Sequence, residues 1–364
     1  MRDTRAATLT GDRMDHIFDP ELPIIDPHHH LWDFRKVVDR LPVALHPFFD
    51  NMRRHPLYGF DELAADLGSG HNVIATVYVE AGTAYRKDGP TELRPVGETD
   101  HVVGVAAVAA QRGLGGVCAG IVAHADLTLG DQVLDVLEAH RVAGRGRVRG
   151  VRHGASWDED PSVVIPGSRT PPGLLLDDTF RSGYSHLAPL GLTFDALVFE
   201  PQMPDVIDLA RAFPETTIVL NHLGHPLGVG PYADRVEERF APWRASMESL
   251  AGCPNVVTKI GGFAVGLQRP SYLADPPPTV DQMAAAWRPY IETAIELFGP
   301  QRCMFESNFP VDAGGCSYAS LWNVFKHVTE GHTPDDRAAL FAGTAASVYR
   351  LDAELSMASH ARTP

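Results

Sequence analysis

The sequence predicts an α/β protein whose eight parallel strands close into a (β/α)8, TIM-like barrel. Eight apolar, mostly β-branched runs recur along the 364 residues, and each is followed by a helix or a connection that contains one. This alternation is typical of a parallel sheet, and eight repeats favour its closure. The alternative, an open doubly wound sheet, usually carries a glycine fingerprint after its first strand, and none follows Ile25.

The predicted elements follow one another without a low-complexity linker, so a single domain with inserted loops accounts for them. The first strand begins near Ile24 and leads into three histidines, His28 to His30. The other strands are predicted over 72–80, 117–124, 147–154, 192–199, 217–222, 255–260 and 303–308. Helices are predicted over 60–68, 98–111, 131–140, 179–190, 204–213, 233–251, 280–298, 318–329 and 335–349. Irregular connections are expected over 37–58 and 155–178, an extension over 1–20, the barrel over 21–351 and a tail over 352–364.

The amino-acid composition indicates which classes of binding partner to expect. Hydrophobic residues make up 44% and charged residues 21%, which is typical of a soluble globular protein. The formal charge of −15 disfavours nucleic acid and anionic membranes. No signal-peptide or membrane-span pattern stands out, and the four cysteines have no C-x-x-C spacing. We therefore expect a cytoplasmic protein that acts on a small molecule, with no nucleic-acid or membrane partner, and a homo-oligomer stays an open alternative.

Polar side chains follow nearly every predicted strand. Barrel enzymes place their sites at the carboxyl ends of their strands, so these side chains are expected to converge on one active site. In chain order they are His28, His30, Tyr78, Glu80, His124, Asp126, Arg152, His153, Glu200, Gln202, Asn221, His222, His225, Lys259, Glu306, Ser307, Asn308 and Asp312.

Three histidines are the first candidates for chemistry. Side chains alternate along a strand, so His28 and His30 share one face and His29 points to the other. Two imidazoles on one face suit metal ligation or proton transfer. His222 is the expected third imidazole, with a histidine that bonds a carbonyl of the following turn as the alternative.

The expected substrate contacts include two cations. Arg152 and Lys259 would hold a carboxylate or an oxyanion, although a buried ion pair of Arg152 with Glu200 or Glu80 is equally compatible with the sequence. Trp32 would form a flat wall, or else simply pack. The expected substrate-binding set is Trp32, Tyr78, Glu80, Arg152, His153 and Lys259.

Five motifs carry a resemblance to a known family. They are Asp26-Pro27-His28-His29-His30-Leu31-Trp32, Gly150-Val151-Arg152-His153, Phe213-Pro214 through Asn221-His222-Leu223-Gly224, Lys259-Ile260-Gly261-Gly262, and Phe305-Glu306-Ser307-Asn308-Phe309-Pro310. Together they resemble the amidohydrolase-2 type proteins of the amidohydrolase superfamily, in the branch of 2-pyrone-4,6-dicarboxylate lactonase and the sugar lactonases.

The resemblance implies a distorted eight-stranded barrel and hydrolysis of a ring ester or amide. Members with a metal bind a divalent ion, usually zinc, through the His-x-His pair, a later histidine and a strand-eight Asp that is also the base. Some lactonases of this branch are thought to work without metal. Carried over, the metal ligands are His28, His30 and His222.

The strand-eight motif departs from the family pattern. Relatives commonly read Ser-Asp-Trp-Pro where this chain reads Ser307-Asn308-Phe309-Pro310, and a neutral amide cannot take a proton from water. Glu306 would share a face with Asn308, and Asp312 lies four residues on, so either carboxylate is a candidate base. The departure places both the base and the metal in question.

Three functions follow as hypotheses. The first is a hydrolase that opens a small, carboxylated lactone or a cyclic amide by attack of water on the ring carbonyl, with the 155–178 loop covering the site. The second is a metal-dependent, non-oxidative decarboxylase of an aromatic or unsaturated acid. The third is a barrel that binds a ligand without catalysis.

Overall fold

Eight parallel strands form the centre of the molecule. The computed structural model describes residues 16–40, 46–165, 170–269 and 272–351, so the predicted 352–364 tail and most of the 1–20 extension lie outside the described residues. The eight strands lie side by side in the order in which they occur along the chain. The two edges meet where Asn308 N donates to His28 O (2.8 Å) and His30 N donates to Phe309 O (2.7 Å). The predicted barrel is therefore confirmed.

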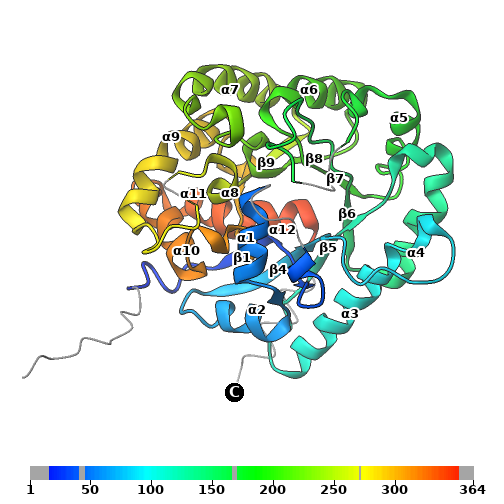
Figure 1. The fold of residues 1–364 in the computed structure, drawn as a ribbon, viewed down its shortest axis with the longest axis horizontal. Helices are drawn as coiled ribbons and strands as arrows, with labels where there is room; N and C mark the ends of the chain where they lie inside the picture. The colour runs from blue at the N-terminus through cyan, green and yellow to red at the C-terminus, as the bar shows by residue number, and fades with distance from the viewer. Residues whose placement is uncertain (1–15, 41–45, 166–169, 270–271, 352–364) are drawn as a thin grey trace, which may run out of the picture.

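The elements lie close to their predicted ranges. The barrel strands are β1 (Ile24–His29), β4 (Val73–Val79), β5 (Gly120–His124), β6 (Val148–Arg152), β7 (Thr193–Ala196), β8 (Ile218–Leu220), β9 (Val256–Ile260) and β10 (Cys303–Phe305). The longer helices are α2 (Phe60–Leu67), α3 (Val96–Gln111), α4 (Val133–Gly144), α5 (Asp178–Tyr184), α6 (Met203–Ala212), α7 (Val236–Ala251), α9 (Val280–Phe298) and α10 (Tyr318–Val328). The shorter helices are α8 (Phe263–Leu267), α11 (Pro334–Ala338) and α12 (Thr344–Tyr349). The helices surround the sheet, as Figure 1 shows.

The expectation of an irregular 37–58 segment is wrong in part. This segment holds α1 (Pro47–Arg54), and β3 (Leu57–Tyr58) pairs antiparallel with β2 (Trp32–Asp33). Helix α1 is stabilised by tertiary contacts, because Asn51 Nδ2 donates to the carbonyls of Pro310 (2.9 Å) and Val311 (3.1 Å). No periodic pattern in eight residues could have indicated those contacts.

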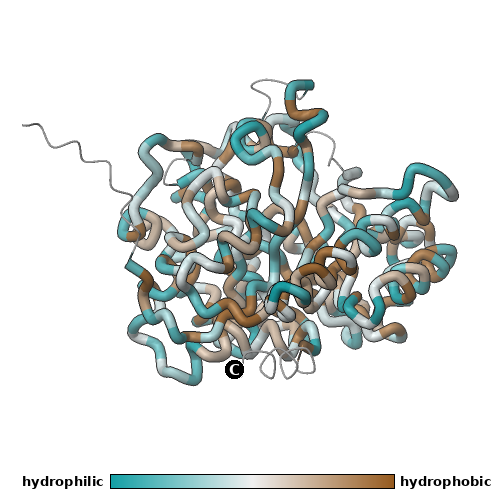
Figure 2. The backbone as a smooth tube through the Cα atoms, turned by 90° about the horizontal axis from the view of Figure 1, so that it is seen from below, coloured by the Kyte–Doolittle hydropathy of each residue, from teal (hydrophilic) through white to brown (hydrophobic). Residues whose placement is uncertain are grey.

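The barrel interior is polar at the carboxyl ends of the strands and apolar below them. The apolar part contains a cluster of side chains from the strands, namely Ile25, Val77, Val122, Val257 and Met304. Tyr349 and Leu351 belong to the same cluster. Outside the sheet, a larger apolar core joins the strands to the helices. Hydrophilic segments are most frequent in the outer turns and helices (Figure 2). Within the described ranges, no helix is long and apolar enough to cross a membrane.

A register shift in β1 places the histidines. Ile25 faces the interior, and the pairing of β1 with β4 is irregular between Asp26 and His29. As a result Asp26 bonds Tyr318 of the outer helix α10 (3.1 Å), while His28 faces the barrel interior. His29 points outward and bonds Thr76 Oγ1 (2.9 Å), as the alternation predicted.

Candidate active site

A cavity of about 510 Å³ opens at the carboxyl ends of the strands. Its polar lining comes from six different strand ends, namely His30, Glu80, His124, Arg152, His222 and Asn308. Trp32 and His153, two of the expected substrate contacts, also line it. Ile165 and Thr170, from the long 155–178 connection, reach the same cavity.

Three of the predicted histidines come together in the structure. The ring centroids of His28 and His30 lie 4.9 Å apart, and those of His28 and His222 lie 4.7 Å apart. His30 Nδ1 lies 2.8 Å from the carbonyl oxygen of Val79, which can only accept, so we assign the proton to Nδ1. This bond fixes the ring and leaves Nε2 as an acceptor, an arrangement typical of metal-ligating histidines.

Glu306 lies against two of these histidines and is hydrogen-bonded to His222. Its Oε1 lies 2.6 Å from His222 Nδ1, and its Oε2 lies 2.6 Å from His28 Nδ1. The backbone N–H of His222 also donates to Oε1 (3.2 Å). Burial raises the pKa of Glu306 to about 8, although the nearby Lys259 opposes this shift. Burial and nearby cations hold the pKa values of His28 and His222 well below the ordinary histidine value, so both imidazoles are neutral at pH 7.

The glycine pair after β9 makes room for this arrangement. A Cβ on Gly261 would lie 2.4 Å from Glu306 Cγ, and one on Gly262 would lie 2.5 Å from His222 Cγ. Gly262 also has a φ of +67°, which disfavours any side chain. Packing against Glu306 and His222 thus explains the two glycines of the Lys259-Ile260-Gly261-Gly262 motif.

The side chains of His28, His222 and Glu306 suit a divalent ion. One donor atom each from His28, His222 and Glu306 lies within 4.8 Å of the others, and two imidazoles with a carboxylate are a typical zinc donor set. Among the described residues this group contains Glu306 and not His30, the predicted third ligand. Two cations flank it, because Lys259 Nζ and Arg152 Nη1 each lie 3.4 Å from a ring nitrogen of His28.

Arg152 is paired inside the cavity wall. Its Nε lies 2.6 Å from Glu80 Oε1, and its Nη2 donates to the Glu80 carbonyl (2.7 Å). The ion pair with Glu80, one of the partners that the sequence allowed, is confirmed. Glu200, the other predicted partner, instead contacts Arg239.

Lys259 lies beneath the cavity, in the barrel interior. Its Nζ lies 2.7 Å from Asp195 Oδ2, with both side chains fully buried. Tyr349 donates to the same carboxylate at 3.1 Å. Lys259 does not belong to the cavity lining, so it acts on the chemistry through its charge beside His28, His222 and Glu306.

Tyr78 also lies away from the cavity. It points outward from β4 and donates to Glu98 Oε1 (2.7 Å), because its neighbours Val77 and Val79 occupy the interior face. The strand pattern could have indicated this orientation. Sequence reasoning missed Phe34, Phe48, Tyr85 and Val265, which line the cavity from connections whose course the sequence does not fix.

Of the strand-eight residues, Asn308 reaches the cavity and Asp312 does not. Asn308 lines the cavity with a left-handed backbone (φ 53°). Asp312 is fully buried, and its Oδ1 accepts from Val265 N (3.3 Å) in the first turn of α8. Asn308 Nδ2 lies 3.5 Å from the same oxygen. Burial raises the pKa of Asp312 to about 7.

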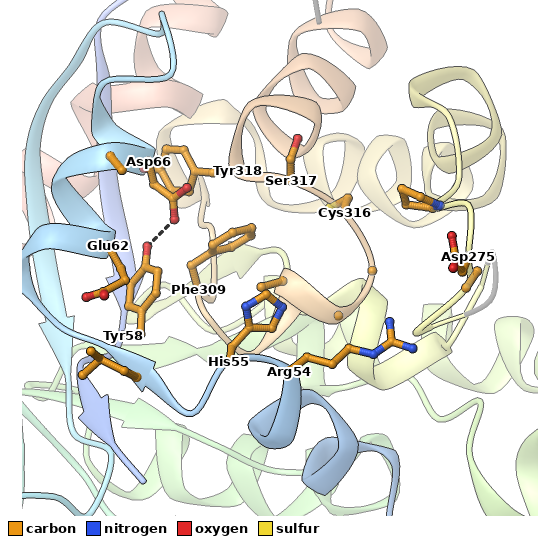
Figure 3. A pocket seen from close by; sticks show the side chains of 17 residues that line it. Arg54, His55, Tyr58, Glu62, Asp66, Asp275, Phe309, Cys316, Ser317 and Tyr318 are labelled. Carbon is orange, nitrogen blue, oxygen red and sulfur yellow. Dashed lines mark hydrogen bonds between the residues drawn. The ribbon is translucent and has the colours of Figure 1, made fainter. Parts of the chain in front are cut away.

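A second cavity, of about 610 Å³, lies on the other side of the loop that follows β10 (Figure 3). Phe309 and Tyr318 form part of its wall, and Tyr58 donates to Asp66 there (2.6 Å). Arg54 and His55 lie on its opposite side. None of the predicted site residues lines it. The first cavity is lined by His30, Trp32, Glu80, Arg152, His153, His222 and Asn308, whereas His28 and Glu306 are fully buried behind its lining.

Known proteins resemble this chain along most of its length. Residues 25–351 match the family model described as amidohydrolase. An uncharacterized protein, y4mH of Sinorhizobium fredii, is 34% identical over 338 residues, which cover 91% of this chain and 99% of that protein. An L-fucono-1,5-lactonase of Burkholderia multivorans is 31% identical over 217 residues, 58% of this chain and 67% of the lactonase.

A solved structure agrees with the fold. An amidohydrolase from Burkholderia multivorans with bound HEPES has a TM-score of 0.67 and 26% identity, covering 90% of this chain and 99% of that one. The same protein in another crystal form contains bound zinc and has a TM-score of 0.66. The family match, the lactonase relative and the shared barrel lead to one conclusion: this chain belongs to the amidohydrolase family and is a hydrolase.

Proposed function

We propose that this protein hydrolyses a small neutral lactone by attack of water on the ring carbonyl. The observation that carries the proposal is the Glu306–His222 pair, in which a carboxylate holds Nδ1 of an imidazole that lines the cavity. With Nδ1 donating to Glu306, Nε2 keeps its lone pair and can take a proton from water. The curated relatives named L-fucono-1,5-lactonase and L-rhamnono-gamma-lactonase support a cyclic ester as substrate.

The reaction needs one proton transferred and returned. His222 Nε2 takes a proton as the water oxygen bonds to the carbonyl carbon, and Glu306 stabilises the resulting imidazolium. The Arg152 guanidinium, which lines the cavity, stabilises the charge on the carbonyl oxygen. When the ring C–O bond breaks, the imidazolium returns the proton to the ring oxygen, and the product is a hydroxy acid.

His222 and Glu306 have these roles in the metal-free enzyme. In a metal-bound enzyme they would instead be ligands together with His28, and zinc suits this donor set. A bound divalent ion would lower the pKa of water to about 7 and polarise the carbonyl. Lys259 and Arg152 place positive charge on either side of His28. These two positive charges oppose the binding of a metal cation beside His28, and the Arg152 guanidinium supports the negative charge that develops on the substrate.

A neutral substrate fits the charges better than the carboxylated one that the sequence led us to expect. Glu80 already balances Arg152, and Asp195 balances Lys259 outside the cavity. A substrate carboxylate would have to compete with Glu80 for the guanidinium. The same balance disfavours a decarboxylase, whose substrate is a carboxylate.

A lactone panel tests the proposal. We expect proton release from neutral five- and six-membered lactones, a lower rate with their carboxylated analogues, and a loss of about 10²- to 10⁴-fold in kcat for His222→Gln. The assay is run before and after treatment with a chelator, to measure what the metal adds. No turnover of any lactone, or full activity in His222→Gln, would contradict the proposal.

A further inference from the structure

A small annex adjoins the catalytic cavity on the side of β7, β8 and β9. It has a volume of about 60 Å³, and Ser156, Ile165, Leu197, His225 and Val265 line both it and the catalytic cavity. The ring of His225 lies 5.3 Å from that of His222, centroid to centroid. His225 therefore connects the annex with His222, the proposed base.

The walls of the annex are apolar and buried. Val163, Phe199, Leu227 and Val229 belong to one buried apolar cluster, with exposed fractions of 2, 6, 1 and 5%. Val265 closes the side toward α8, with 4% exposed. The annex thus offers an apolar surface that no side chain of the described residues fills.

Two of the polar side chains at the edge of the annex, His46 and Ser156, form hydrogen bonds within the protein. His46 Nδ1 accepts the N–H of Phe48 (3.1 Å) at the start of α1. Ser156 Oγ donates to the Leu197 carbonyl (3.3 Å). His225 packs edge-on against Phe199, with ring centroids 5.6 Å apart, and its Nδ1 has no hydrogen-bond partner among the described residues. The apolar walls nevertheless make up most of the annex surface, and they favour an alkyl group over a charged group as the occupant.

We propose that the annex binds a short alkyl substituent of the lactone ring and sets the enzyme's selectivity for substituted over unsubstituted rings. This inference rests on the proposed lactonase function. A cavity of about 150 Å³ holds a benzene molecule, so about 60 Å³ suits a chain of about two or three carbons. Each buried methylene contributes about 0.8 kcal/mol, so we expect kcat/KM to rise about fourfold per carbon up to that length and then fall.

The test uses a homologous series. Six-membered lactones with no substituent, or with methyl, ethyl, propyl or pentyl next to the ring oxygen, are assayed for kcat/KM. The matching lactams, which keep the ring and resist hydrolysis, are titrated by calorimetry to measure binding without turnover. The full-length protein is used throughout.

Val163 is the position at which to change the annex, because it lines the annex and not the catalytic cavity. Val163→Ala should move the optimum to a longer chain and Val163→Leu to a shorter one, with the unsubstituted lactone hydrolysed as before. Val164→Ala is the matched control, since Val164 belongs to the same apolar cluster but not to the annex lining, and it should leave the optimum unchanged.

The possible results of these assays distinguish a failure of the annex proposal from a failure of the lactonase proposal. A chain-length optimum in lactam affinity that Val163→Ala shifts would support the annex even if no lactone were hydrolysed, in which case only the lactonase proposal fails. Hydrolysis with no dependence on chain length, or the same optimum in Val163→Ala and the parent protein, would overturn the annex proposal alone.

Discussion

Two pairs of opposite charge occupy this barrel, and they differ in what they can touch. The Arg152–Glu80 pair lines the cavity, with 7 and 16% of the two side chains exposed. The Lys259–Asp195 pair lies below it with both side chains fully buried. Both cations lie near the carboxyl ends of parallel strands, and both approach His28 at 3.4 Å. Of these two pairs, the first can meet a substrate, whereas the second acts on the reaction through its charge beside His28, His222 and Glu306.

The difference separates two roles of charge in one site. A fully buried pair keeps its geometry and its electric field whichever ligand is bound. Removal of one partner lowers the stability of the fold, because the remaining partner is a buried, uncompensated charge. A pair in the cavity wall can exchange its partner for a ligand and so affects selectivity. The predictions below test this distinction, from the largest effect to the smallest.

Breaking the fully buried pair should cost the most. Lys259→Met leaves Asp195 without its cation, and we expect the free energy of unfolding to fall by about 3–5 kcal/mol, measured by urea denaturation. Arg141→Met is the matched control, because it removes a cation from a solvent-exposed pair with Glu138 and should change stability little. Similar small losses in both variants would contradict the role given to Lys259.

Glu306→Gln should cost activity more than stability. The amide keeps the shape of the side chain but cannot balance an imidazolium, so we expect kcat/KM to fall by about 10²- to 10⁴-fold. Asp312→Asn is the comparison, since Asp312 is equally buried but accepts from Val265 N and does not hold His222, and its loss should be clearly smaller. The reverse order of the two losses would move the base to Asp312.

The pH profile of chelator-treated enzyme should report Glu306. Burial raises its pKa to about 8, and the ionised form is the one that supports His222. As pH falls below about 8, Glu306 takes up a proton, and log kcat/KM should decrease with a slope of one. Asp312→Asn should keep this limb, and a profile that stays flat from pH 6 to about 9 would contradict the assignment.

Changing the pair in the cavity wall should have the smallest effect, on selectivity. Glu80→Gln frees the Arg152 guanidinium, so the ratio of kcat/KM for a carboxylated over a neutral lactone should rise by about tenfold. Asp126→Asn removes a more exposed carboxylate beside His153 and serves as the charge-matched control. An equal rise in both variants would indicate a general effect of charge and not the release of Arg152.

Much of this protein could be predicted from the sequence. Alternation of β-branched runs with helices determined the barrel, and the polar residues that end the strands located the site, because parallel strands end at one edge. The period of two placed His28 and His30 opposite His29. The substitution of Asn308 for the family's aspartate was also visible, together with Glu306 as an alternative carboxylate.

The tertiary structure alone decided which polar residues share a cavity. Lys259 and Arg152 look alike as cations at strand ends, yet one is sealed under the site by Asp195 and Tyr349 while the other lines the cavity. Asp312 could have folded toward the site but instead bonds the first turn of α8. Depth in the barrel, the irregular register of β1 and the course of the loops depend on contacts between distant segments. Local sequence patterns do not encode these contacts.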